Sequence, residues 1–176
     1  IVRQGKALYV GISRWPLEAL QVAEAYLRQH DVPLLIYQGR LNLLDREPQQ
    51  QGILDFCAEH GIGFISFSPL AQGLLTDRYL NGIPEDSRMS KGKFLKQEVL
   101  TPELLCYLRG LNAVAAERGE TLAEMALSWI LHQRGVTSVL VGASSTAQLE
   151  KNLRSVGATT FDKEIPPFIP AASEKG

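Results

Sequence analysis

Continuous apolar runs alternate with amphipathic stretches along the whole chain. Each run is short, and most are followed by apolar residues at helical spacing, which is typical of strands and helices that succeed one another in an α/β fold. Because the runs are apolar at successive positions, they predict parallel strands covered on both faces. The sequence predicts four such strands, at residues 7–13, 32–37, 64–67 and 138–142.

Capping residues mark several helix ends. Thr101 precedes Pro102, which suits the first position of a helix. Thr121 and Glu124 have the spacing of a capping box, and the pair Ser145 and Gln148 repeats it. The sequence predicts helices at about residues 17–27, 48–60, 102–117, 122–130 and 146–155, with a loop at 38–42.

The longest segment without a regular pattern follows the third predicted strand. No helical period returns between Ser68 and Thr101. Loops of this length are usually lids or binding segments, although an ordinary surface excursion has the same pattern. Arg78, Ser87 and Arg88 lie in this loop. Such side chains after a barrel strand are typical of an anion or cofactor clamp.

Polar residues recur where the predicted strands end. They are Ser13, Gln38, Ser68 and Ser144. In parallel α/β folds this edge of the sheet carries the ligand. One serine at a strand end is more often a simple helix cap, but four polar ends with a glutamine among them favour a binding site.

Two further features at this edge each have two interpretations. The segment from Gly142 to Ser145 joins a strand to a helix N-terminus, where free N–H groups and the helix dipole favour a phosphate. Ser145 also suits a plain N-cap. Phe67 ends the third strand, where its ring would either stack on a planar ligand or belong to the core.

Two architectures fit this order of elements: an open doubly wound sheet and half of a (β/α)₈ barrel. No G-x-G-x-x-G fingerprint follows a predicted strand, and no P-loop, hydrolase or zinc-protease motif occurs. His30, His60 and His132 have no other ligand at metal-binding spacing and lie near helix C-termini. The sequence therefore predicts no metal site.

Composition narrows the class of protein. The 176 residues are 45% hydrophobic and 21% charged, as in a globular domain, and the net charge of −1 suggests neither a nucleic-acid nor a membrane partner. No apolar run is long enough for a transmembrane helix. We expect Cys57 and Cys106 to be buried free thiols in a reducing, cytoplasmic setting. No secretory signal follows Ile1, and we expect the chain to begin inside something larger.

Four segments carry a family resemblance. They are GISRW from Gly11, FSPLAQGLLTDRY from Phe67, NGIPEDSR from Asn81 and SVLVGASSTAQLEKNL from Ser138. Together they resemble the aldo-keto reductases, in particular the subgroup related to potassium-channel β subunits, and especially bacterial glyceraldehyde 3-phosphate reductases. The resemblance extends to about Phe161 and implies the C-terminal half, strands five to eight, of a (β/α)₈ barrel. It implies one partial, NADP-binding domain over residues 1–176, with 165–176 as an irregular tail.

The resemblance implies NADP as the cofactor. Ser13 and Gln38 match residues that bond the nicotinamide carboxamide, and Phe67 matches the aromatic residue that stacks on the ring. Further matches are to a loop along the pyrophosphate (Ser68, Pro69, Leu70 and Gln72), a basic lid (Arg78, Ser87 and Arg88) and contacts to the adenosine phosphate and adenine (Gly142, Ser144, Gln148 and Asn152).

The chain also departs from the family pattern. The catalytic tetrad of Asp, Tyr, Lys and His lies on strands that would precede Ile1, so no catalytic residue is assigned here. Arg14 and Lys151 replace an Asn and a Glu that many members have at cofactor contacts. Prolines in residues 165–176 exclude the usual closing helix.

The resemblance implies NADPH-dependent reduction of aldehydes and ketones to alcohols in the intact enzyme. This chain would supply the cofactor-binding half and be inactive alone. The implied partner is a small carbonyl substrate, and neither a nucleic acid nor a membrane is expected as a partner. Both a monomer and a homo-oligomer are compatible with the resemblance. The alternative is an NADP-binding regulatory subunit that resembles the potassium-channel β proteins.

Overall fold

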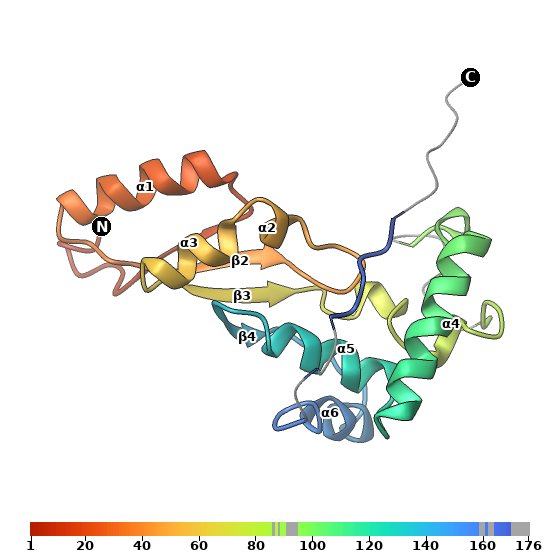
Figure 1. The fold of residues 1–176 in the computed structure, drawn as a ribbon. Coiled ribbons are helices and arrows are strands. Elements are labelled where there is room, and N and C mark those ends of the chain that lie inside the picture. Colours follow the sequence, from red (N-terminus) through yellow and green to blue (C-terminus); the bar gives the residue numbers. More distant parts are fainter. Residues whose placement is uncertain (86, 88, 91–94, 159–160, 162–163, 170–176) are drawn as a thin grey trace.

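The computed structural model describes residues 1–85, 87, 89–90, 95–158, 161 and 164–169 and contains a four-stranded sheet (Figure 1). The strands lie in chain order, β1-β2-β3-β4, and each neighbouring pair is parallel. A doubly wound sheet reverses its strand order at a switch point, whereas a barrel adds each strand beside the last. The order therefore selects the second architecture, a partial (β/α)₈ barrel.

Helices connect the strands, and the described residues between β3 and α4 form short 3₁₀ helices and no α-helix or strand. In Figure 1, α1 lies at the end of the molecule near the N-terminus and α4 lies at the opposite end. The strands are β1 (Val10–Ser13), β2 (Leu34–Arg40), β3 (Gly63–Phe67) and β4 (Val136–Val139). The helices are α1 (Leu17–Gln29), α2 (Glu47–Gln50), α3 (Ile53–Glu59), η1 (Ala71–Gly73), η2 (Asp77–Tyr79), η3 (Gln97–Val99), α4 (Pro102–Glu117), α5 (Leu122–Leu131) and α6 (Thr146–Leu153).

Several predicted boundaries are wrong. Strand β1 begins at Val10, three residues later than predicted. Strand β2 continues through Gln38–Arg40, predicted as a loop, because these residues pair with Ile65–Phe67 of β3. The predicted helix at 48–60 is split into α2 and α3, because Gly52 adopts a left-handed φ of 75°. Strand β4 lies a few residues before its predicted position. The Leu140 N–H still donates to the Ser66 carbonyl at 2.8 Å, and the chain then leaves the sheet.

One face of the sheet is packed and the other is partly open. Tyr37 and Phe64 stack on the packed face, with ring centroids 5.7 Å apart. On the other face Ser13, Gln38 and Ile65 occupy adjacent register positions and are exposed or half-buried. The prediction that both faces are covered is therefore wrong for the described residues. This face of a barrel segment is covered only when the other strands close the barrel.

The segment 164–169, which we call the strap, crosses the helical layer in an extended path without helix or strand. The Arg46 guanidinium donates to the carbonyls of Ile165 at 2.9 Å and Pro166 at 3.3 Å. The Tyr107 hydroxyl donates to the same Pro166 carbonyl at 2.7 Å. Residues near the end of the described chain are thus fixed against α4 and the segment before α2.

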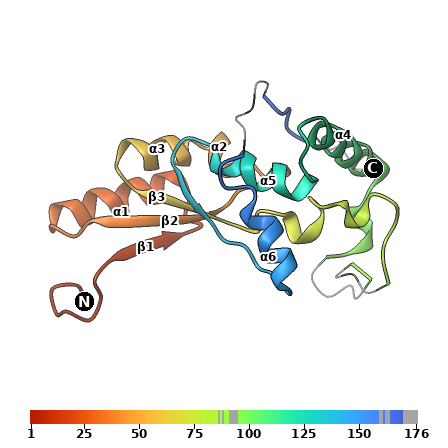
Figure 2. The ribbon, with the colours of Figure 1, turned by 90° about the horizontal axis from the view of Figure 1, so that it is seen from below.

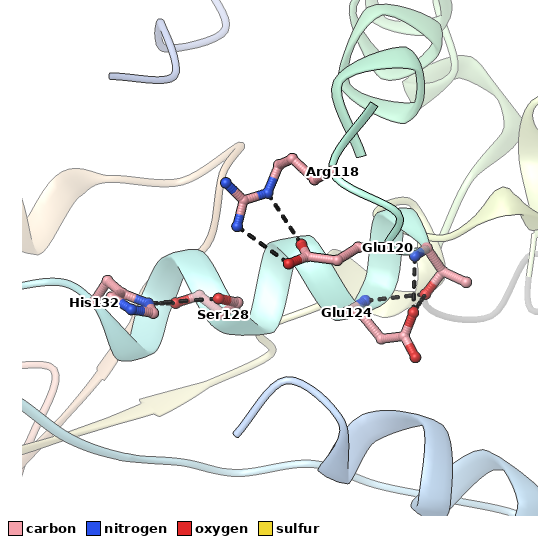
Figure 3. Close-up of polar contacts among 6 residues, drawn as sticks. Arg118, Glu120, Glu124, Ser128 and His132 are labelled. Atoms are coloured by element: carbon pink, nitrogen blue, oxygen red, sulfur yellow. Dashed lines mark hydrogen bonds and ion pairs between the residues drawn. The ribbon is translucent and has the colours of Figure 1, made fainter. Parts of the chain in front are cut away.

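The turn between α4 and α5 is stabilised by side-chain bonds (Figure 3). The Thr121 hydroxyl accepts from the Glu124 N–H at 3.2 Å, and the Glu124 carboxylate accepts from the Thr121 N–H at 2.8 Å. The capping box predicted here is confirmed. Arg118 and Glu120 form an ion pair of 3.1 Å beside it.

The two cysteines lie in different surroundings. Cys57 is buried in α3, and burial raises the pKa of its thiol to about 12. Cys106 is exposed, because α4 buries a different stripe that includes Leu104, Leu108 and Leu111. The prediction of two buried thiols is wrong for Cys106. Over the described part of the chain, no helix combines the length and the apolar character needed to cross a bilayer.

Candidate functional site

A cleft of about 650 Å³ lies beyond the carboxyl ends of β3 and β4. One wall comes from the loop after β3, and the other comes from the segment that leads from β4 into α6. The two walls are about 70 residues apart in the chain, and they meet because β3 and β4 are paired. Predicted site residues in the lining are Ser68, Pro69, Leu70, Gln72, Arg78, Gly142, Ser144 and Gln148.

The carboxyl ends of β1 and β2 carry a second pair of predicted site residues. Ser13 is in register with Gln38, and its hydroxyl lies 3.4 Å from the Gln38 side-chain oxygen, a long hydrogen bond. Arg14 follows with a left-handed φ of 59°, and its N–H donates to the Gln38 carbonyl at 3.0 Å. The two polar side chains are therefore adjacent and leave further donors and acceptors for a ligand.

The loop after β3 has an unusual backbone. Ser68, Ala71 and Gln72 all have left-handed φ values, between 46° and 60°. Residues other than glycine are rarely found there, and such strain persists only where neighbouring contacts enforce it. The loop also includes the buried Pro69. Its shape is thus imposed by its surroundings.

Asn42, which was not predicted as a site residue, lies in the turn after β2 and is fully buried. Its side-chain amide donates to the Ser68 carbonyl at 3.0 Å, and its side-chain oxygen accepts from the N–H groups of Leu44 and Asp45. A single asparagine in a predicted loop has no distinctive pattern. The only available signal was its polar side chain within the apolar segment LNLL.

The N-terminus of α6 forms part of the second wall. The Ser145 hydroxyl accepts from the Gln148 N–H at 3.2 Å, as an N-cap does. The Gln148 side-chain oxygen accepts instead from the N–H and hydroxyl of Ser144, at 2.8 and 3.1 Å. The second capping box is therefore only half formed. The Gln148 side chain bonds the N–H of Ser144 instead of that of Ser145, and so fixes Ser144 at the cleft.

The remaining predicted site residues lie in other positions. Ser87 is fully buried, and its hydroxyl accepts from the Ser90 N–H at 3.1 Å. Asn152 is buried in α6, and Phe67 is half-buried at the end of β3. None of these three is part of the cleft lining. Arg88 lies outside the described residues.

The His, Cys, Asp and Glu side chains of the described residues are dispersed. No three His, Cys, Asp or Glu side chains there gather as a metal site would require. His30, His60 and His132 follow α1, α3 and α5, and each ring lies within 2.9 Å of a last-turn carbonyl. Burial raises the pKa of Tyr37, whose hydroxyl donates to the Trp15 carbonyl.

Comparison with known proteins gives relatives for the whole arrangement. The chain is 50% identical over 167 residues to an L-glyceraldehyde 3-phosphate reductase of Escherichia coli O157:H7 and 49% identical over 169 residues to one of strain K12. Both matches cover 93% of this chain but only 48% and 49% of the relatives. The chain thus spans about half the length of the curated relatives it matches.

A solved structure has the same fold. It is a thermostable aldo-keto reductase, Tm1743, in complex with the inhibitor epalrestat, and it superposes with a TM-score of 0.66 at 24% identity. The match covers 92% of this chain and 47% of that one. The model of the Aldo/keto reductase family matches residues 1–166. On this match, and with the strand order of a partial barrel, the chain belongs to the aldo/keto reductase family.

Proposed function

We propose that this chain supplies the NADP-binding half, strands five to eight, of a carbonyl reductase. The observation that carries the proposal is the cleft between the Ser68–Gln72 loop and the Gly142–Gln148 segment. Its volume lies in the range of small-molecule sites. A helix N-terminus and an exposed arginine, Arg78, line it and suit the phosphates of a dinucleotide.

The residues divide into three groups along the extended cofactor. Ser13 and Gln38 would hold the nicotinamide carboxamide, with Phe67 beside the ring. The loop after β3 would follow the pyrophosphate, and Gly142, Ser144 and Gln148 would contact the adenosine end. NADPH supplies the hydride to the carbonyl carbon when it is bound. The task of this chain is to orient it, and the proton donor would come from the other half of the barrel.

The relatives' name suggests the substrate class, a phosphorylated three-carbon aldehyde. A reducing, cytoplasmic setting belongs to the same proposal, since Cys57 and Cys106 are both free.

The cofactor preference provides a direct test. The 2′-phosphate is the only charged difference between NADPH and NADH, and a guanidinium binds phosphate with two parallel hydrogen bonds. In the longer protein that contains this chain, Arg78→Ala and Arg88→Ala should each weaken NADPH binding by about one to two decades, since a charged hydrogen bond contributes ~1.5–3 kcal/mol. NADH binding should hardly change.

The measurement is the dissociation constant of each cofactor by fluorescence titration. Arg28→Ala is the matched control, because Arg28 lies on α1, has a mostly exposed side chain and pairs with Glu24 at 3.2 Å. Equal losses for NADPH and NADH in both arginine variants would assign the arginines to the pyrophosphate or to loop packing. Unchanged binding of both cofactors would contradict a role for them in the site.

Turnover separates binding from catalysis. We expect the 176-residue chain alone to reduce no aldehyde above a no-protein control. Proton transfer by a positioned acid contributes about 10²–10⁴-fold, and no such acid is assigned in this chain. NADPH consumption with a panel of aldehydes measures this. Turnover that purifies with the chain would show that this half contains a proton donor. Cofactor binding without turnover in the longer protein would favour a regulatory subunit.

A further inference from the structure

The turn after β2 is connected to the cleft through one side chain. Asn42 is fully buried, and three hydrogen bonds hold its side-chain amide. The orientation of the amide follows from these partners. Its oxygen faces the N–H groups of Leu44 and Asp45, both at 2.9 Å, and its NH₂ group faces the carbonyl of Ser68 at 3.0 Å. The reverse orientation would oppose donors to donors.

The turn itself is rigid, so Asn42 is a fixed donor. The backbone N–H groups of Asn42 and Asp45 donate to each other's carbonyls, at 2.9 and 3.1 Å. An ion pair of 3.1 Å joins Arg40 to Asp45. Nearby, the buried Ser66 hydroxyl of β3 donates to the Leu41 carbonyl at 2.8 Å. The β2 turn and the end of β3 are therefore cross-linked by two buried side-chain bonds.

The residue that Asn42 contacts begins the strained loop. Ser68 has a φ of 52°, and its carbonyl also accepts from the Ala71 N–H at 3.0 Å, which starts η1. Strained backbone of this kind requires contacts that enforce it. The Asn42 amide is such a contact. It comes from the turn after β2, and Asn42 does not itself line the cleft.

We propose that Asn42 is a positioning residue for the cofactor. Its amide holds the Ser68 carbonyl and so sets the path of the Ser68–Gln72 backbone along one wall of the cleft. This inference rests on the proposed function, because it assumes that the loop contacts a dinucleotide. Asn42 acts through the loop and makes no contact with the cofactor.

Asn42→Asp isolates the donor. Aspartate keeps the oxygen that accepts from Leu44 and Asp45 but places a second oxygen against the Ser68 carbonyl. In the longer protein, this variant should raise the dissociation constant of NADP⁺ and of NADPH by about tenfold. Ser66→Ala is the matched control. It removes a buried side-chain bond from the same region without releasing Ser68, so its cofactor affinity should stay within about twofold of wild type.

Thermal unfolding of each variant, recorded without cofactor, separates positioning from stability. A structural role alone predicts that affinity follows the melting temperature in both variants. A positioning role predicts that Asn42→Asp and Ser66→Ala have similar melting temperatures and that only Asn42→Asp loses affinity for the cofactor. It also predicts that Asn42→Asp raises the Michaelis constant for NADPH more than it lowers kcat.

The outcomes distinguish this proposal from the proposed function. If the wild-type protein binds neither NADP⁺ nor NADPH, the proposed function fails. If wild type binds and Asn42→Asp binds equally well, only the positioning role is overturned. Should Asn42→Asp not fold, Asn42→Ser decides, because its short hydroxyl can accept within the turn but cannot reach Ser68.

Discussion

Helices α1 and α5 pack against the same sheet, but they are buried to very different degrees. In α5 nearly every residue from Leu122 to Ile130 is buried, whereas α1 buries only Leu20. The difference comes from their neighbours. Helix α5 contacts β4, α4 and α6, whereas α1 packs mainly on β2 (Figures 1 and 2). A helix on a sheet is buried all round only when other elements flank it on both sides.

Part of the exposed side of α1 is apolar. Trp15, Val22 and Tyr26 line an open hollow there, and Val22 and Tyr26 are 71% and 59% exposed. We call this surface the α1 flank. Contiguous apolar surface usually marks a contact site. In a complete barrel the helix of the preceding unit would cover the α1 flank. The contrast between α1 and α5 thus indicates that the α1 flank is the surface at which another part of a barrel would pack.

The largest expected effect is on association. We expect the 176-residue chain to self-associate, because β1 and β4 end the sheet with unpaired edges and the α1 flank is exposed. Size-exclusion chromatography with light scattering measures this. Val22→Lys with Tyr26→Lys should reduce the association, since two charges then lie on the flank.

Val114→Lys is the control for this prediction, because Val114 is also exposed but lies on α4. It should leave the association unchanged. A monodisperse wild-type monomer that melts cooperatively would show that the partial barrel is stable without a partner. The exposure of α1 would then not mark a contact surface.

The next effect is on stability. Trp129→Ala in α5 should lower the free energy of unfolding by about 3–5 kcal/mol, the usual loss for a buried aromatic residue. Tyr26→Ala in α1 should change it by no more than about 0.5 kcal/mol, as is typical of exposed positions. Urea unfolding at one protein concentration, below that of association, measures both. Similar losses would mean that α1 is covered in solution.

The sequence predicted the apolar stripe of α1 and α5 equally well, yet it could not distinguish their burial. Periodicity shows which side of a helix is apolar, but it does not show whether a second element covers that side. The same limit explains Cys106, which belongs to a predicted helix but faces away from the core. Helix starts were more predictable, because caps at Thr101 and Thr121 depend on local spacing.

The candidate site shows the same division. The polar strand ends and the long loop were visible in the sequence, and several of their residues line one cleft. The bond of Asn42 to the loop was not, and neither was the bond of Arg46 to the strap, because these partners lie far away in the chain. Asn42 bonds a residue 26 positions away, and Arg46 bonds Ile165 across 119 positions. Such contacts depend on the tertiary fold and leave no local pattern.

A smaller loss of stability is expected when the contact between Arg46 and the strap is removed. Arg46 is buried, lies 4.5 Å from the Trp129 ring of α5 and donates to the carbonyls of Ile165 and Pro166. Arg46→Ala should cost about 2–3 kcal/mol of stability, because hydrogen bonds from a charged group contribute ~1.5–3 kcal/mol. Thermal and urea unfolding measure it.

Arg134→Ala is the matched control for the strap. Arg134 pairs with Asp55 at 3.3 Å, and both side chains are mostly exposed. Exposed pairs contribute ~0–1 kcal/mol, so the loss should be at the low end of that range. If the two arginine variants are equally stable, the strap does not hold the helical layer, and the burial of α5 must come from α4, α6 and the sheet alone.

The smallest expected effect on stability comes from the N-terminal caps of α1 and α5. Helix α1 starts at Pro16 without a side-chain cap, whereas α5 starts with the capping box of Thr121 and Glu124 (Figure 3). Burial acts to raise the pKa of Glu124, but the bonds from Thr121 and the nearby Arg154 outweigh it, and the pKa lies below its usual value. The ionised form is therefore favoured in the folded state. Its contribution is complete above the unfolded pKa of ~4.3 and is lost as the pH falls through the lower folded value.

Glutamine can also complete a capping box, so Glu124→Gln removes the charge while keeping the bonds. At pH 7 it should be less stable than wild type by about 0.5–1 kcal/mol, and the difference should shrink as the pH is lowered towards 3. Glu18→Gln removes the corresponding first-turn charge of α1, which is exposed and makes no cap, so its effect should be smaller and screened by salt. Urea unfolding at several pH values compares the two. An equal pH dependence for both variants would mean that the capping box of α5 contributes no more than a charge near any helix N-terminus.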